Sequence, residues 1–128
     1  MQYITHRRFK GMSLCGEVNI PAMSECTLIS KIIAYNGKAI CYAGSENAHQ
    51  YFACNDDGNG MERGELTQKI MKRLSKRDAD YQVRWDKVWA DETCQKYRRS
   101  DYSDYWLWNH DFYNADINDL RHIAELVA

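Results

Sequence analysis

The chain has 128 residues, a length that suits one domain able to bury a core without disulfides or metal. Its hydrophobic content of 45% and charged content of 27% are ordinary for a soluble globular protein, and its net charge of −1 favours neither an acidic nor a basic partner. No apolar run approaches the roughly 18 residues that cross a bilayer, and the first residues lack the apolar core of a signal peptide. Because the cysteines are odd in number, five, and show no C-x-x-C spacing, we expect free thiols in a reducing compartment. The missing signal-peptide core favours a cytoplasmic location.

The first third of the chain reads as β-structure. Residues 2–9 alternate as one strand, which would place Arg7 and Arg8 on opposite faces near a sheet edge. Residues 13–20 predict a second strand, with a kink or bulge at Gly16.

A hairpin is the strongest local signal in the sequence. Two β-prone runs, 26–35 and 38–42, flank Asn36 and Gly37, which tolerate the positive φ of a type I′ turn. We therefore expect a small antiparallel sheet of about four strands in a β-rich part, residues 1–44.

Residues 45–128 predict a helical part of roughly three to five helices. A short helix begins at Ser45, a good N-cap, and has an apolar side. That side is formed by Ala48, Tyr51, Phe52 and Cys54.

A loop over residues 55–64 forms the predicted hinge between the two parts. It resembles the start of a calcium loop, with weak ligand candidates Asn55, Asp57, Asn59 and Glu65. The bidentate carboxylate of position twelve is missing, because Glu65 comes one residue early. The alternative is a turn-rich loop whose side chains cap the helix that follows, and we predict no metal.

An amphipathic helix with a basic face follows over residues 62–77. Leu66, Ile70, Met71 and Leu74 recur at helical spacing on its apolar side. The basic side could contact the phosphates of nucleic acid, or it is simply a solvated face. The candidate residues are Arg7, Arg8, Lys69, Lys72, Arg73, Lys76 and Arg77.

Two further helices complete the predicted pattern. Asp78 can cap the first of them, whose apolar stripe is Tyr81, Trp85, Val88 and Trp89. The last helix begins at Asp116, and its buried stripe is Ile117, Leu120, Ile123, Ala124 and Val127.

An aromatic and acidic segment lies between these two helices, over residues 101–113. Its tryptophans cannot all face inward from one regular helix, so it predicts a partly exposed, acid-rimmed protein interface. The interface candidates are Asp101, Tyr102, Asp104, Tyr105, Trp106, Trp108 and Asp111.

The sequence contains only weak indications of a catalytic site. Cys54 or Cys94 could pair with His49 or His110 as nucleophile and base, if the fold brings them together. The dipeptide His110-Asp111 resembles part of a metal site, but it needs further ligands. We assign no catalytic residue and no cofactor.

Several runs of the sequence resemble a family of small prophage and mobile-element proteins of gut Firmicutes that has no established activity. The resemblance rests on residues 3–11, Cys15-Gly16, 45–48, 55–58, 76–78 and 106–110. It implies a bacterial, phage-linked setting, in which small accessory proteins commonly bind nucleic acid or a host defence factor.

These observations predict an α+β protein of one domain, 1–128. The leading hypothesis is a non-enzymatic protein that binds a protein partner, such as an anti-CRISPR-like inhibitor of a host defence system. The alternatives are a nucleic-acid-binding accessory protein that uses the basic helix, and a small metal- or cysteine-dependent enzyme.

Overall fold

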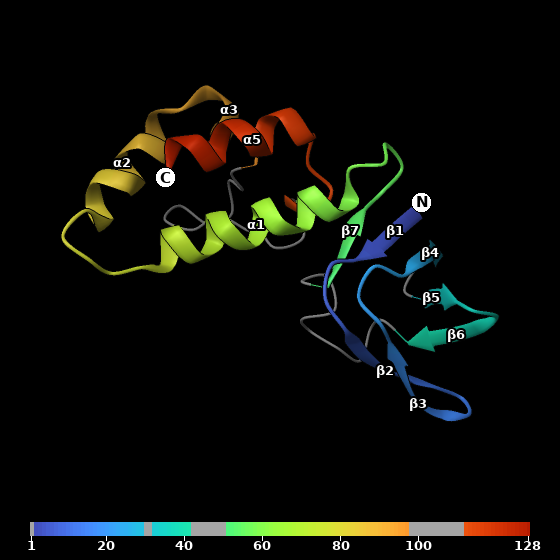
Figure 1. Cartoon of the computed structure of the whole chain (residues 1–128). Coiled ribbons are helices and arrows are strands. Elements are labelled where there is room, and N and C mark those ends of the chain that lie inside the picture. The colour runs from blue at the N-terminus through green and yellow to red at the C-terminus, as the bar shows by residue number, and fades with distance from the viewer. Residues whose placement is uncertain (1, 30–31, 42–50, 98–111) are drawn as a thin grey trace. The chain divides into compact units, whose positions relative to one another are not determined.

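A computed structural model describes residues 2–29, 32–41, 51–97 and 112–128, and its fold is α+β, as predicted (Figure 1). The strands are β1 Gln2–Thr5, β2 Phe9–Ser13, β3 Gly16–Ile20, β4 Glu25–Ile29, β5 Ile32–Tyr35, β6 Lys38–Cys41 and β7 Phe52–Cys54. The helices are α1 Gly60–Ser75, α2 Tyr81–Ala90, α3 Glu92–Gln95 and α5 Ile117–Leu126. In these described residues, no helix has the length and apolar character needed to cross a membrane.

The chain divides into two compact units, Met1–Gly64 and Glu65–Ala128, and the division falls inside α1. The first unit holds all seven described strands and the second holds most of the helical residues. The division therefore lies later in the chain than residue 44, where the sequence predicted the β-rich part to end.

The first unit is a single antiparallel sheet with the strand order β3-β2-β6-β5-β4-β1-β7. The sheet curls around an apolar core, to which each strand contributes one buried hydrophobic residue (Figure 1). In strand order along the chain these are Tyr3, Phe9, Ile20, Cys26, Ile33, Ile40 and Phe52. Since side chains alternate along a strand, their sequence neighbours lie on the opposite, outer face.

Two predictions about the first strands are wrong. Residues 2–9 do not form one strand, because β1 ends at Thr5 and β2 begins at Phe9. Ser13 and Gly16 do not belong to one kinked strand either. They pair across a tight hairpin whose turn is completed by Gly16 at φ 111°, a region that favours glycine.

The hairpin at Asn36 and Gly37 is confirmed. The two residues have φ of 50° and 75°, which is the positive-φ pair of a type I′ turn, and Tyr35 pairs with Lys38 across it.

The last strand, β7, contradicts the short helix predicted from Ser45. Phe52, Ala53 and Cys54 are extended and pair with β1, so two of the four residues expected on that helix's apolar side belong to a sheet. The strand has only three residues, and it is stabilised by pairing with a strand about fifty positions earlier in the chain, which no local pattern encodes. The remainder of the predicted helix, 45–50, lies outside the described residues.

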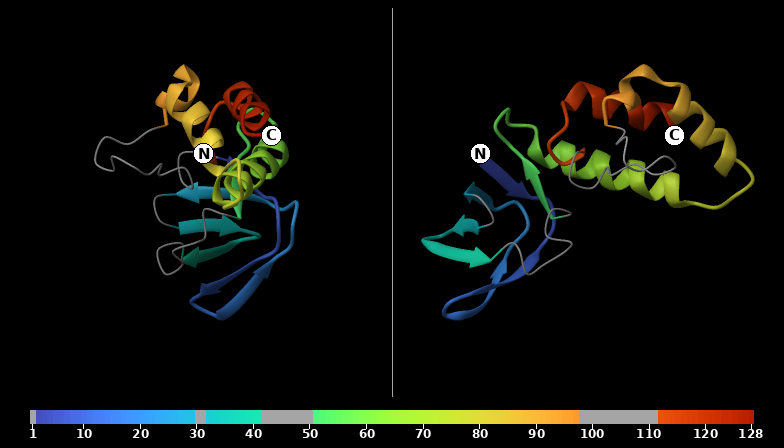
Figure 2. Two further views of the ribbon diagram at one scale, coloured as in Figure 1. Left: turned by 90° about the vertical axis from the view of Figure 1, so that its left-hand side faces the viewer. Right: turned by 180° about the vertical axis from the view of Figure 1, so that it is seen from behind.

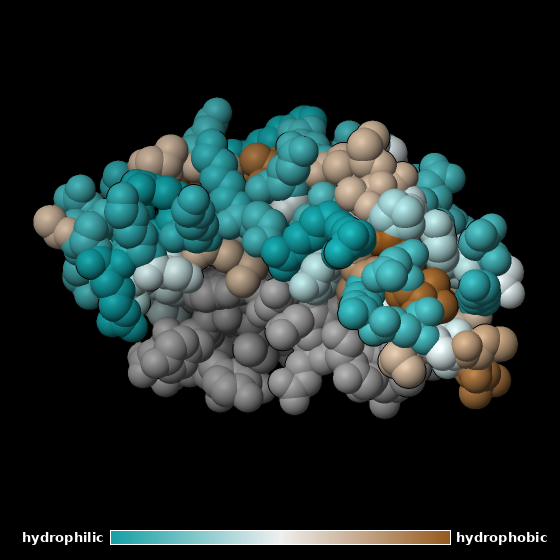
Figure 3. Space-filling model, turned by 60° about the horizontal axis from the view of Figure 1, so that its bottom comes forward, coloured by the Kyte–Doolittle hydropathy of each residue, from teal (hydrophilic) through white to brown (hydrophobic). Residues whose placement is uncertain are grey.

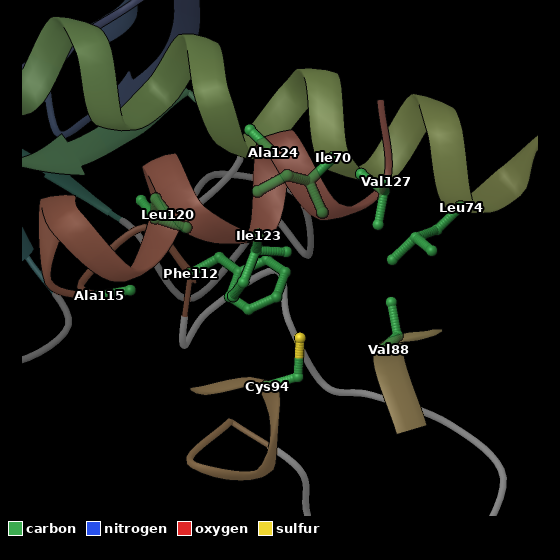
Figure 4. Close-up of a cluster of buried hydrophobic side chains, with 10 residues drawn as sticks. All are labelled: Ile70, Leu74, Val88, Cys94, Phe112, Ala115, Leu120, Ile123, Ala124 and Val127. Carbon is green, nitrogen blue, oxygen red and sulfur yellow. The ribbon is translucent and has the colours of Figure 1, made fainter. Parts of the chain in front are cut away.

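The second unit packs its helices around one apolar cluster, and α5 lies alongside α1 and α2 in the views of Figures 1 and 2. Figure 4 shows Ile70 of α1 directed toward α5 and Leu74 of α1 directed toward Val88 of α2 and Val127, with Cys94 of α3 in the same cluster. All five residues predicted for the buried stripe of the last helix are buried, which confirms that helix. The residue at which that helix was predicted to begin, Asp116, is its N-cap, and the Asp116 carboxylate accepts hydrogen bonds from the backbone amides of Asn118 and Asp119.

The cap predicted for the second helix is wrong. Asp78 lies before α2 rather than at its N-cap, which is Asp80. The Asp78 carboxylate instead pairs with Arg84, whose Nη1 lies 2.9 Å away and whose side chain is buried. Arg84 also donates to the carbonyl of Lys76, so it joins the turn between α1 and α2 to the second helix.

Candidate functional site

The loop before α1 is held to the sheet by its own polar groups. The backbone N–H of Asn55 donates to the backbone carbonyl of Gln2. The Asp56 carboxylate accepts from the backbone N–H of Gln2 at 2.8 Å. The side chain of Asn55 accepts from the Gly60 amide at 2.8 Å, which caps the start of α1. β4 therefore pairs along one edge of β1, and β7 and the start of this loop pair along the other edge.

Two glycines allow the first turn of α1 to lie against the sheet. A Cβ on Gly60 would lie 2.4 Å from Cγ2 of Ile4, and one on Gly64 would lie 2.5 Å from ring carbons of His6. Such distances are closer than real side chains adopt, so the approach requires glycine at both positions.

The calcium candidates of the loop are used in bonds within the protein. Asp57 accepts from the Asn59 amide and forms an ion pair with Arg63, which holds the pKa of its carboxyl well below its usual range. Asn55 serves as a cap, and Glu65 is exposed on α1. In the part of the chain that the structure describes, no three His, Cys, Asp or Glu side chains gather as metal ligands would.

The two cysteines weighed as nucleophiles both have thiols that resist ionisation. Burial first, and the nearby Asp91 second, raise the pKa of Cys94 to about 12. Burial also raises the pKa of Cys54, whose thiol donates to Asp56. Since the thiolate is the nucleophile, neither environment activates its cysteine. The proposed partners His49 and His110 lie outside the described residues.

The predicted basic face of α1 is only partly intact. Lys69 and Lys72 are exposed, and among described residues no acidic side chain lies within ion-pair distance of either. The Nε of Arg73 donates to the carbonyl of Val127 at 3.0 Å. Lys76 lies 3.8 Å from Asp78, so part of its charge is balanced.

The remaining basic candidates are placed elsewhere. Arg77 lies over the ring of Tyr81, with 5.0 Å between guanidinium carbon and ring centroid. Arg7 and Arg8 are exposed between β1 and β2, and Arg7 lies 4.3 Å from the ring centroid of Tyr51. These two belong to the first unit, whereas Lys69, Lys72, Arg73, Lys76 and Arg77 belong to the second.

All seven interface candidates of the aromatic segment, residues 101–111, lie outside the described residues. The neighbouring aromatic residues Phe112 and Tyr113 are each 1% exposed, and Phe112 packs edge-on against Tyr97. These neighbours form core rather than surface.

An exposed apolar row crosses the outer face of the sheet, and sequence reasoning missed it. The register pairs Ile29 with Ile32, Ile32 with Cys41, and Cys41 with Met12, so these four positions share one face across β4, β5, β6 and β2. Ile29 is 62% exposed, Ile32 47% and Met12 57%. On the face in Figure 3, hydrophobic side chains likewise interrupt a largely hydrophilic surface.

The hairpin between β2 and β3 adds a further apolar side chain. Leu14 at its tip is fully exposed, two residues after Met12. We call Met12, Leu14, Ile29 and Ile32 the outer apolar row. The alternation of Met12 and Leu14 with polar residues was a visible signal, but their grouping with Ile29 and Ile32 depends on strand order.

Comparison of the chain with models of protein families, with curated proteins and with solved structures finds no match.

Proposed function

We propose that this protein acts by binding another protein, without catalysis, through the outer apolar row of its sheet. The observation that carries the proposal is the cross-strand alignment of Ile29, Ile32 and Met12, all of them substantially exposed. The solvated face of an antiparallel sheet normally carries polar residues. Exposed apolar side chains aligned across such a face instead favour an interface, because burying them against a partner removes them from water.

The surroundings of the row fit a protein partner. The pair Lys10 and Glu17 lies beside Met12 on the same face, with 3.1 Å between Lys10 Nζ and Glu17 Oε1. An apolar centre with a charged rim is the usual composition of a protein–protein interface. The raised thiol pKa values of Cys54 and Cys94 support a function without cysteine catalysis.

The partner class to test first is a bacterial defence protein, on the ground of the resemblance to prophage proteins. In that setting the protein would be an anti-CRISPR-like inhibitor, held in the host cytoplasm. The segment 101–111 stays a predicted second part of the interface.

The test compares two variants with the wild type in affinity capture from bacterial lysate and against purified defence complexes. The row variant carries Met12→Gln, Leu14→Asn, Ile29→Thr and Ile32→Thr. The matched control carries Met23→Gln and Val83→Thr, which remove exposed apolar side chains outside the row, 71% and 52% exposed. We expect a partner that binds wild type and control but is lost with the row variant. A row variant that is folded and binds the same proteins as wild type contradicts the proposal.

A further inference from the structure

A second surface, on α1 of the helical unit, has a different chemistry. A shallow hollow of about 470 Å³ lies along this helix, and the described residues that line it include two lysines and no carboxylate. They are Gln68, Lys69, Met71, Lys72 and Ser75.

Two polar side chains of the hollow, Ser75 and Gln68, already donate hydrogen bonds within the protein. The Ser75 hydroxyl donates to the carbonyl of Met71 at 2.7 Å, and the Gln68 amide donates to the hydroxyl of Tyr113. Among the described residues that line the hollow, the Nζ atoms of Lys69 and Lys72 are therefore the main groups offered to a ligand. Unpaired ammonium groups beside a concave surface attract an anion.

The arrangement along the helix suits a chain of regularly spaced anions. Lys69, Lys72 and Lys76 are exposed at positions three and four residues apart, so with 1.5 Å of rise per residue they span about 10.5 Å. One strand of nucleic acid carries a phosphate about every 3.4 Å along the duplex axis, so this length matches roughly three phosphates. Glu65, one turn before Lys69, and Asp78, after Lys76, bound the row at its two ends.

An anionic membrane fits this surface less well. A helix that lies in a lipid interface needs an apolar face open to the acyl chains. The apolar face of α1 is buried, with Ile70 0% and Leu74 2% exposed. We infer that the row of Lys69, Lys72 and Lys76 binds the phosphate backbone of nucleic acid, independently of sequence. This inference rests on α1 alone and does not depend on the protein interface proposed above.

The test is a polarisation titration of a short labelled oligonucleotide, single-stranded and as a duplex, at about 50 and 200 mM salt. Three phosphate contacts predict that affinity falls roughly 20- to 40-fold between these salt concentrations. The variant Lys69→Glu/Lys72→Glu is expected to bind at least about tenfold more weakly at the lower salt. The variant Lys69→Gln/Lys72→Gln should weaken binding less, in the same direction.

The control is Lys38→Glu/Lys87→Glu, which changes the net charge equally at two exposed lysines outside the row. We expect it to bind within about threefold of wild type, because the phosphates contact α1. An equal loss in both charge-reversal variants would show only an effect of net charge and overturn the inference. Absence of binding at the lower salt, or binding to phosphatidylserine vesicles but not to the oligonucleotide, would overturn it too.

Discussion

The guanidinium of Arg63 binds the carboxylate of Asp57, with Nη2 2.6 Å from Oδ2. Arg63 is 3% exposed and also donates to the carbonyl of Cys54, the last residue of β7. One buried side chain in the first turn of α1 thus joins that helix to the loop before it and to the sheet. In the sequence the same arginine reads as part of the basic helix, yet its charge is compensated inside the protein.

Replacing Asp57 with Asn should destabilise the fold by roughly 2 kcal/mol, since it removes the ion pair between this carboxylate and a buried guanidinium. This loss of stability is smaller than that expected for a fully buried ion pair, because the Asp57 side chain is 43% exposed. Urea denaturation at neutral pH measures the change. As a control, Asp80→Asn alters a carboxylate that makes no side-chain cap hydrogen bond and should change stability by less than about 0.5 kcal/mol. Equal stability of the two variants would contradict the role of the pair.

The same carboxylate makes the fold sensitive to acid. Its side-chain hydrogen bonds, that from Arg63 first and that from the Asn59 amide second, lower its pKa in the folded state. The unfolded chain therefore takes up a proton more readily, so the stabilisation is complete above about pH 4 and is lost as the pH falls further. The difference in free energy of unfolding between wild type and Asp57→Asn should shrink from pH 7 toward pH 2. A difference that stays constant over this range would be inconsistent with the depressed pKa.

Gly64→Ala should destabilise the protein although alanine is the better helix former by about 1 kcal/mol. The new methyl group would overlap the ring of His6, and overpacking of this kind costs roughly 1–3 kcal/mol. Thermal or urea unfolding measures the effect. Glu65→Ala, at the next and exposed position, serves as the control and should be nearly neutral. A Gly64→Ala protein as stable as wild type would show that His6 moves aside without cost.

The thiols should differ strongly in reactivity. Cys15 is exposed at the tip of the β2–β3 hairpin, whereas burial raises the pKa of Cys26 to about 11 and that of Cys94 to about 12. At pH 8, iodoacetamide should modify Cys15 well before Cys26 or Cys94 in the folded protein, as peptide mass spectrometry can follow. Rapid modification of Cys94 would instead identify an activated thiol and revive the cysteine-enzyme hypothesis.

The parts of the fold that could be predicted are those encoded locally. The 3.6-residue period of the apolar residues in α1 and α5 predicts both helices, and Asn36-Gly37 determines its hairpin by backbone preference. β7 could not be predicted, because its three residues become a strand only by pairing with β1.

The two candidate surfaces, the basic residues of α1 and the outer apolar row, could also be predicted from the sequence only in part. The basic residues of α1 were visible as a helical pattern, but the internal ion pair that Arg63 forms with Asp57 was not. The outer apolar row depends on the order β2-β6-β5-β4, which brings Met12 onto the same face as Ile29 although 17 positions separate them in the chain. No periodicity within a single strand carries that information.

Methionine oxidation of the protein in complex with a captured partner tests the central claim most directly. Met12 lies in the outer apolar row and Met23 lies outside it, and in the free protein they are 57% and 71% exposed. Both should oxidise readily in the free protein. In the complex we predict that Met12 is protected while Met23 remains as reactive as before. Undiminished oxidation of Met12 in a complex that remains assembled would contradict binding through the outer apolar row.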